Sequence, residues 1–155
     1  SLLRFRNDSL GVLEAAARLG DDMTSFAEAP RDVVLQDEQG RPLLAGDTGR
    51  RFFEAAWMHT YNGTYYFSYS TGDTHFILYA TSRSPYGPFT VRGKVLEPVL
   101  GWTNHHSIVE FKGKWYLFYH DAQLSGGQTH LRNIKVTELQ SRADGSIVTV
   151  DAYIE

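Results

Sequence analysis

A hairpin pattern that recurs along the chain constrains its fold more than any other feature. Two short turns, Asn62-Gly63 and Lys112-Gly113, each join two strand-like runs rich in Tyr, Phe and Trp, and two-residue turns of this kind are typical of β-hairpins. The two glycines are 113 − 63 = 50 positions apart, and at this offset residues 59–69 overlay residues 109–119. A third strand-like run follows each hairpin, at 76–81 and at 131–139.

Units of about 50 residues with four short strands have the size of propeller blades. The alternative is two similar hairpins in a sandwich or barrel, but the aromatic pattern and the third strand recur together with the turn. An aromatic content of 14% also favours strands. The sequence therefore predicts an all-β fold, a partial β-propeller of about two to three blades of four-stranded antiparallel sheet.

Outside the repeat, one stretch has helical spacing. Ser9 is suited to cap a short N-terminal helix, apolar residues follow on one face, and Gly20 is suited to end it. We therefore expect residues 1–22 to be a helical lead-in and residues 23–155 to be the propeller part. Further short strands are expected at 33–35 and 147–150.

Composition excludes several functions. The net charge is −3 and no basic cluster runs along the chain, which argues against a nucleic-acid partner. No apolar run approaches the roughly 20 residues of a membrane span, and without cysteine no disulfide or thiolate site is possible. The chain begins at Ser1 without a signal-peptide pattern, which we interpret as a processed, nicked or engineered end. The sequence does not indicate the cellular compartment of the protein.

The repeat also predicts where a site lies. The offset carries Glu54 onto Asn104 and Ala55 onto His105, so both segments should open the channel-lining strands of successive blades and point polar groups into one pocket. Glu54 has apolar neighbours on both sides, and burial among them would raise its pKa and suit it to general acid catalysis. The alternative is an ordinary exposed Glu at a strand start.

Three more polar residues are candidates. His105 and His106 are adjacent, so on a strand at most one faces the channel, and two histidines do not make a zinc site. One core and one surface histidine is the alternative. Arg132 interrupts an apolar strand and would hydrogen-bond sugar hydroxyls or a carboxylate, although many strand arginines are surface residues with buried stems.

Five runs of the sequence carry a further signal: 52–59, 65–72, 84–89, 101–109 and 113–121. Together they resemble the family 43 glycoside hydrolases, and in particular their β-xylosidases and α-L-arabinofuranosidases. The resemblance covers the chain from about Asp21 onward. It implies a five-bladed β-propeller and an inverting mechanism with three carboxyls: an Asp base, an Asp that tunes the acid, and a Glu acid.

The resemblance implies a role for each candidate. Glu54 matches the family's general acid. His105 matches its central histidine, which in relatives lies near a bound calcium with intervening waters, so calcium is a possible cofactor. Arg132 resembles a late arginine near the substrate pocket, and Trp57 lies in the same motif as Glu54. We therefore expect Arg132, Trp57 and His105 to contact a pentose-containing oligosaccharide.

The length departs from the family pattern. Family domains are about twice as long, and the blades with the base and the modulating Asp precede the matching region. We therefore expect residues 23–155 to be the C-terminal half of a propeller glycosidase domain, acting on xylosyl or arabinofuranosyl linkages of hemicellulose. The acid is present without the base, which has to lie roughly 6.5–9.5 Å away, so the chain alone should be inactive or nearly so.

A half-propeller also exposes sheet edges and apolar faces, so it should associate. The expected partner is the missing N-terminal half as a second chain, or further copies of this chain. The alternative function is a non-catalytic sugar-binding or structural half-propeller that oligomerises.

Overall fold

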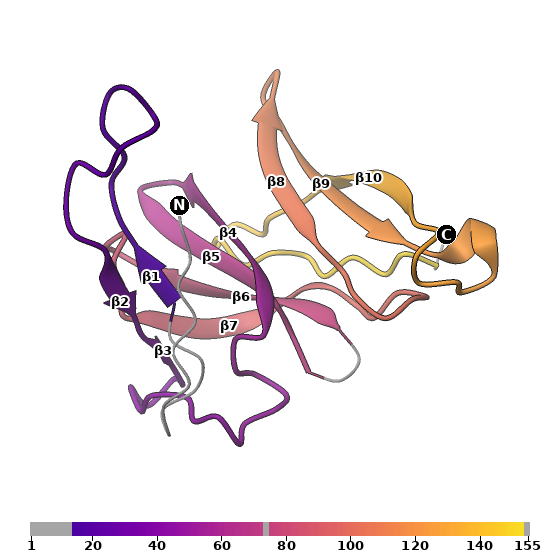
Figure 1. Cartoon of the computed structure of the whole chain (residues 1–155), viewed down its shortest axis with the longest axis horizontal. Helices are drawn as coiled ribbons and strands as arrows, with labels where there is room; N and C mark the ends of the chain where they lie inside the picture. The colour runs from indigo at the N-terminus through magenta and orange to yellow at the C-terminus, as the bar shows by residue number, and fades with distance from the viewer. Residues whose placement is uncertain (1–13, 73–74, 154–155) are drawn as a thin grey trace.

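The structure, a computed structural model, describes residues 14–72 and 75–153, and over these residues the fold is all-β with one short 3-10 helix, η1 (Gln123–Ser125) (Figure 1). A five-stranded sheet has the order β3-β7-β6-β5-β4, a three-stranded sheet has the order β10-β9-β8, and β1 pairs with β2. None of the helical structure in these residues is long and apolar enough to cross a membrane. The strands are β1 Glu14–Ala16, β2 Arg31–Val33, β3 Leu35–Gln36, β4 Glu54–Tyr61, β5 Thr64–Thr71, β6 Phe76–Ser82, β7 Phe89–Leu96, β8 His106–Phe111, β9 Lys114–Asp121 and β10 Asn133–Leu139.

Both predicted hairpins are confirmed. β4 and β5 pair antiparallel up to Tyr61↔Thr64, and β8 and β9 up to Phe111↔Lys114. The residues between the strands have positive φ in both turns: 47° and 70° at 62–63, and 53° and 77° at 112–113. Two successive residues of positive φ match the right-handed twist of the flanking strands, which explains the glycine in each turn.

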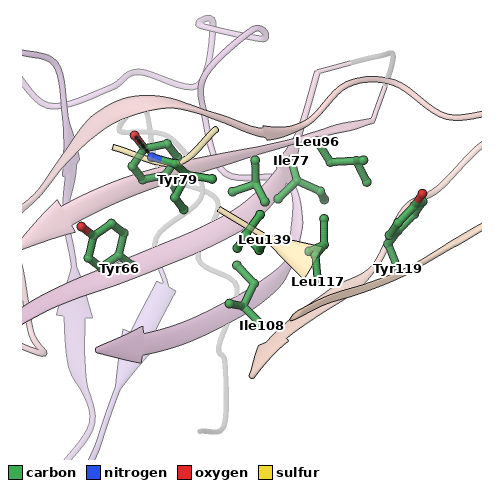
Figure 2. Packing of buried hydrophobic residues seen from close by; sticks show 10 residues of the cluster. Tyr66, Ile77, Tyr79, Leu96, Ile108, Leu117, Tyr119 and Leu139 are labelled. Atoms are coloured by element: carbon green, nitrogen blue, oxygen red, sulfur yellow. Dashed lines mark hydrogen bonds between the residues drawn. The ribbon is translucent and has the colours of Figure 1, made fainter. Parts of the chain in front are cut away.

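The central strands are buried on both faces because their side chains alternate between two apolar clusters. Tyr66 and Tyr79 point toward the three-stranded sheet, whereas Phe67 and Leu78 point to the other side. Figure 2 shows the first cluster between the two sheets. Its members from the second sheet and the C-terminal segment are Ile108, Leu117, Tyr119, Leu139 and Ile147.

Two sheets packed side by side over one apolar cluster are consistent with a partial propeller, although they have five and three strands where four-stranded antiparallel sheets were expected. Apart from β3, which pairs parallel with β7, the strands alternate in direction, so β4, β6, β8 and β10 begin at the same edge at which β5 and β9 end. We call this edge the site rim. The tight turns at 62–63 and 112–113 lie at the opposite edge.

Two sequence predictions need correction. The predicted helix falls partly on residues 1–13, which lie outside the described part, and over the described part Glu14–Ala16 is strand β1, because it pairs with Arg31–Val33 and buries Ala15. The segment 147–150 is no ladder strand. It makes single bridges instead, Ile147 to Ser141 and Val150 to Leu96, so it ties the end of β10 to the end of β7.

Candidate active site at the site rim

A β-bulge decides which face of the first sheet carries Glu54. Glu54 pairs with Ser70 and Trp57 pairs with Ser68, so three steps along β4 match two steps along β5. Ala55 supplies the extra residue with φ 63°, a left-handed conformation that is unusual for an L-residue. In a regular strand Glu54, three residues before Trp57, would lie on the opposite face from Trp57. The bulge absorbs the extra residue, so Glu54 shares the face of Trp57, which is the face toward β8.

Glu54 meets His105 across the two sheets. The Glu54 Oε1 atom lies 3.5 Å from His105 Nε2, and the carboxylate side chain is 28% exposed while the imidazole is 54% exposed. The backbone N–H of His105 donates a hydrogen bond of 3.0 Å to His120 Nε2, and the two imidazole rings stack with centroids 6.0 Å apart. The site rim therefore joins a carboxylate to two histidines, in reach of solvent.

The side chain of His106 points away from that of His105 and links the second sheet to the first. Its Nε2 atom shares a hydrogen bond of 2.6 Å with Ser68 Oγ on β5. Burial lowers the pKa of His106 to about 3, with smaller contributions from the neighbouring His105 and His59. Burial also lowers the pKa of His59 to about 4, where it stacks on Tyr66 at a centroid distance of 5.0 Å. These two histidines are neutral at physiological pH and act as packing groups.

The structure also places the remaining predicted residues. The Trp57 indole N–H donates to the Ile108 carbonyl oxygen at 3.0 Å, so Trp57 links β4 to β8 within the shared core. Arg132 lies at the start of β10 on the site rim, and its Nε atom donates to the Thr129 carbonyl oxygen at 2.9 Å. Contact of either residue with a sugar stays a prediction.

His120 is a site residue that the sequence interpretation missed. Burial is the main cause that lowers its pKa, and the charges of Arg132 and His105 lower it further. The repeat offset contained the signal, because 70 + 50 = 120 carries Ser70, the strand partner of Glu54, onto His120. His120 thus occupies in the second sheet the position that Ser70, the strand partner of Glu54, occupies in the first.

The carboxylate of Asp121, at the end of β9, already has an ion-pair partner and hydrogen-bond donors. Burial would raise its pKa, but hydrogen bonds from the Lys135 ammonium, the Gln123 backbone N–H and the Tyr153 hydroxyl outweigh burial and lower it. The Lys135 Nζ atom lies 2.9 Å from Asp121 Oδ2, and the Tyr153 hydroxyl donates to the same oxygen at 2.9 Å. Asp121 therefore has a structural role and is unsuited to activate a water.

Buried polar atoms without a hydrogen-bond partner gather at the site rim. Within residues 14–72 and 75–153, all but one of the residues with such atoms lie at this edge or in the loops that lead into it, and His59 is the exception. This concentration marks the rim as the part of the fold whose polar groups the described protein atoms do not satisfy. These residues are Arg51, Glu54, Ser70, His75, Thr103, Asn104, His106 and His120.

The donor set fits a protein-coordinated calcium poorly. Calcium takes about six to eight oxygen ligands, and the described residues contain no group of three or more His, Cys, Asp or Glu arranged to hold a metal. Near His105, the Glu54 carboxylate is the acidic group in contact. The expectation of calcium near His105 stays a prediction, and no chemical step below depends on it.

Comparison with known proteins agrees with this picture. The chain is 67% identical over 139 residues to "Xylosidase/arabinosidase" from Bacteroides ovatus, covering 90% of this chain and 43% of that protein. It is 64% identical over 134 residues to "Xylosidase/arabinosidase 43A" from Humicola insolens, covering 86% of this chain and 41% of that protein. The chain thus spans less than half the length of these relatives.

Solved structures superpose closely. A GH43 β-xylosidase/α-arabinofuranosidase from a compost microbial metagenome, in complex with xylotriose and in a calcium-free form, matches with a TM-score of 0.91 and 66% identity, covering 96% of this chain and 45% of that one. A GH43 enzyme from Xanthomonas citri complexed with xylose matches with a TM-score of 0.91 and 56% identity, covering 98% and 46%. The family described as "Glycosyl hydrolases family 43" matches residues 14–147. The chain therefore belongs to glycosyl hydrolase family 43.

Proposed function

We propose that this chain supplies the C-terminal half of an inverting glycoside hydrolase that cleaves xylosyl or arabinofuranosyl linkages, with Glu54 as the general acid. The observation that carries the proposal is the placement of Glu54, which the bulge at Ala55 turns toward β8 and His105. In the proposed enzyme the two sheets are consecutive blades of a five-bladed ring, and the site rim faces the substrate.

In this proposal Glu54 protonates the oxygen of the departing sugar. A general acid has to reach the leaving oxygen and to take up a proton again afterwards, and the partial exposure of Glu54 at the rim suits both steps. His105 contacts the carboxylate directly, and His120 holds the His105 backbone, so the acid keeps a defined position. Arg132 adds a positive charge at the same edge.

The general base comes from the part of the family domain that this chain does not match. Asp121 is tied to Lys135 and Tyr153 and is excluded as a base. The chain spans 43% of its Bacteroides ovatus relative. We therefore expect the pure chain to be inactive or nearly so, and measurable turnover of an aryl xyloside or arabinofuranoside by the verified chain alone would overturn this part of the proposal.

The role of Glu54 is tested in a joined domain, in which this chain replaces the matching part of the Bacteroides ovatus relative. The Glu54→Gln variant should lose about 10²- to 10⁴-fold in kcat on xylobiose, whose leaving sugar needs a proton. On 2,4-dinitrophenyl xyloside the loss should be much smaller, since this leaving group departs as a stable anion. Glu38→Gln, at an exposed turn, is the control. Equal losses on both substrates, or none, would refute the assignment.

One observation favours association, which the alternative function also requires. The outer face of the second sheet exposes Phe111 by 60%, Phe118 by 39%, Ile134 by 82% and Val136 by 55%, and this apolar face has no covering element among the described residues. We propose that the rest of the family ring covers it, since the relatives have more than twice this length. Sedimentation of the chain with and without the N-terminal part of the Bacteroides ovatus relative tests this proposal.

The expected result is a one-to-one complex. Self-association of the chain without uptake of the other half would instead favour the alternative, a non-catalytic sugar-binding or structural half-propeller that oligomerises. A strictly monomeric chain that does not bind the N-terminal part of the relative would contradict both the covering of this face by the rest of the ring and the oligomeric alternative.

A further inference from the structure

Three aromatic rings line up at the site rim beside Glu54. The His75 ring lies 4.8 Å from the Trp102 ring and 5.3 Å from the Phe53 ring, measured between centroids, and both pairs are steeply inclined, at 60° and 62°. Phe53 immediately precedes Glu54 in the chain, and Trp102 lies three residues before His105. The row of rings therefore connects the loops that lead into β4, β6 and β8, and its two outer members come shortly before Glu54 and His105 in the chain.

The middle ring of this row is buried and the two outer rings are exposed. His75 is 4% exposed, Phe53 is 37% exposed and Trp102 is 61% exposed. A single exposed apolar residue needs no explanation, but here two exposed rings contact the same buried ring and so form one aromatic cluster. Neither ring nitrogen of His75 has a hydrogen-bond partner among the described residues, so His75 serves here as a flat support between the other two rings.

The backbone at His75 supports the same conclusion. Its φ of 52° lies in the left-handed region, which is unfavourable for a residue with a side chain. At Asn62 and Lys112 positive φ belongs to the hairpin turns, and at Ala55 it belongs to the bulge. His75 lies at neither, and such outliers cluster at ligand-binding sites.

We propose that Trp102, supported by His75 and Phe53, is a stacking platform for a pyranose ring of a xylo-oligosaccharide, on the leaving-group side of the scissile bond. This inference rests on the proposed function. The C–H face of a pyranose is apolar and carries slight positive charge, so it complements the negative face of an indole ring. Because a general acid donates to the leaving oxygen, the sugar that departs lies on the acid's side, and Phe53 directly precedes Glu54 in the chain.

The platform belongs entirely to this chain, so the chain itself is sufficient for the test. It contains three tryptophans and therefore gives three indole N–H signals in a nitrogen-15 correlation spectrum. Trp115 packs against His59 and Tyr61 near the turn at 112–113, away from the rim, so its signal should keep its shift and serves as the internal control. Titration with xylotriose should shift the Trp102 signal, and the shift should saturate.

Variants make the result specific. Trp102→Ala should weaken xylotriose binding about tenfold or more, whereas Trp102→Phe keeps an aromatic face and should retain most of the affinity. Phe26→Ala is the matched control, since Phe26 is a 41% exposed ring on the loop between β1 and β2, far from the rim (Figure 1). No saturable shift of the Trp102 signal, or equal binding by Trp102→Ala, would overturn the inference.

Failure of the platform and failure of the proposed function give different results. If Glu54→Gln has no effect on xylobiose cleavage in the joined domain while Trp102→Ala weakens xylotriose binding, the acid assignment is wrong and the platform stands. If Glu54→Gln behaves as expected and Trp102→Ala leaves the affinity for xylotriose unchanged, the platform is wrong and the acid assignment stands.

Discussion

Two neutral histidines at the junction of the sheets should make the chain sensitive to mild acid. The pKa of His106 is lowered to about 3 and that of His59 to about 4, chiefly by burial, from an ordinary value of 6.5. The unfolded chain binds protons at both histidines as the pH falls below 6.5, but the folded chain does not. The resulting stability is fully present above pH 6.5 and is lost as the pH falls.

The magnitude follows from the shift in pKa. Between pH 7.5 and pH 5 each histidine should cost about 2 kcal/mol of unfolding free energy, so the pair costs about 4 kcal/mol. That is a large part of the roughly 5–15 kcal/mol that stabilises an ordinary domain. The pH window matters, because below pH 5 the carboxylates of lowered pKa, such as Asp121, begin to contribute to the same trend.

Urea unfolding of the chain at pH 7.5 and at pH 5, followed by circular dichroism, measures this loss. His59→Phe keeps the aromatic contacts with Tyr66 and Trp115 but cannot titrate, so the pH-dependent loss should become smaller by about 2 kcal/mol. His130→Gln, at an exposed position, should leave it unchanged. The reasoning is refuted if His59→Phe loses as much stability between the two pH values as the unmodified chain does.

Two further predictions concern backbone positions, both measured by urea unfolding at pH 7.5. Gly145→Ala should destabilise the chain by about 1–2 kcal/mol more than Gly113→Ala. Both glycines have positive φ, but only at 145 would the new Cβ lie 2.8 Å from the Tyr66 hydroxyl. Equal losses in the two variants would show that the Tyr66 side chain moves aside at no cost. Ala55→Gly should change the free energy of unfolding by less than about 1 kcal/mol. Ala55→Val should lower it by at least about 1 kcal/mol, because a branched side chain is strained at a φ of 63°. An Ala55→Val variant as stable as the unmodified chain would mean that the bulge rearranges.

The hairpins were predictable because their causes are local. Turn glycines, two-residue spacing and alternating side chains within residues 54–71 and 106–121 fix which strands pair, and the structure confirms both hairpins. The N-terminal helix was a wrong extrapolation from helical spacing over its described part, since pairing with β2 decides the conformation of Glu14–Ala16. Such pairing depends on a segment 17 residues away, 31 − 14 = 17, and leaves no local sign.

The site was predictable in part. The repeat offset brought Glu54 and His105 together, and the structure places their side chains 3.5 Å apart. The opposite orientations of His105 and His106 followed from strand alternation. The bulge at Ala55 was not predictable, because the run 52–57 contains no glycine or proline to mark it. Direct substrate contact by Trp57 and Arg132 stays a prediction.

The bulge at Ala55 also separates the position of Glu54 along the sequence from its side of the sheet. Glu54 precedes Trp57 by three residues, so a regular strand of the same sequence would place the Glu54 carboxylate on the far side of the sheet, against the other apolar cluster. Deletion of residue 55 would leave Glu54 two positions before Trp57, and regular pairing with Ser70 and Ser68 would then keep it on the face toward β8. Spacing along a strand therefore does not by itself tell which face a side chain occupies, and in this fold the same candidate site can be built with the extra residue or without it.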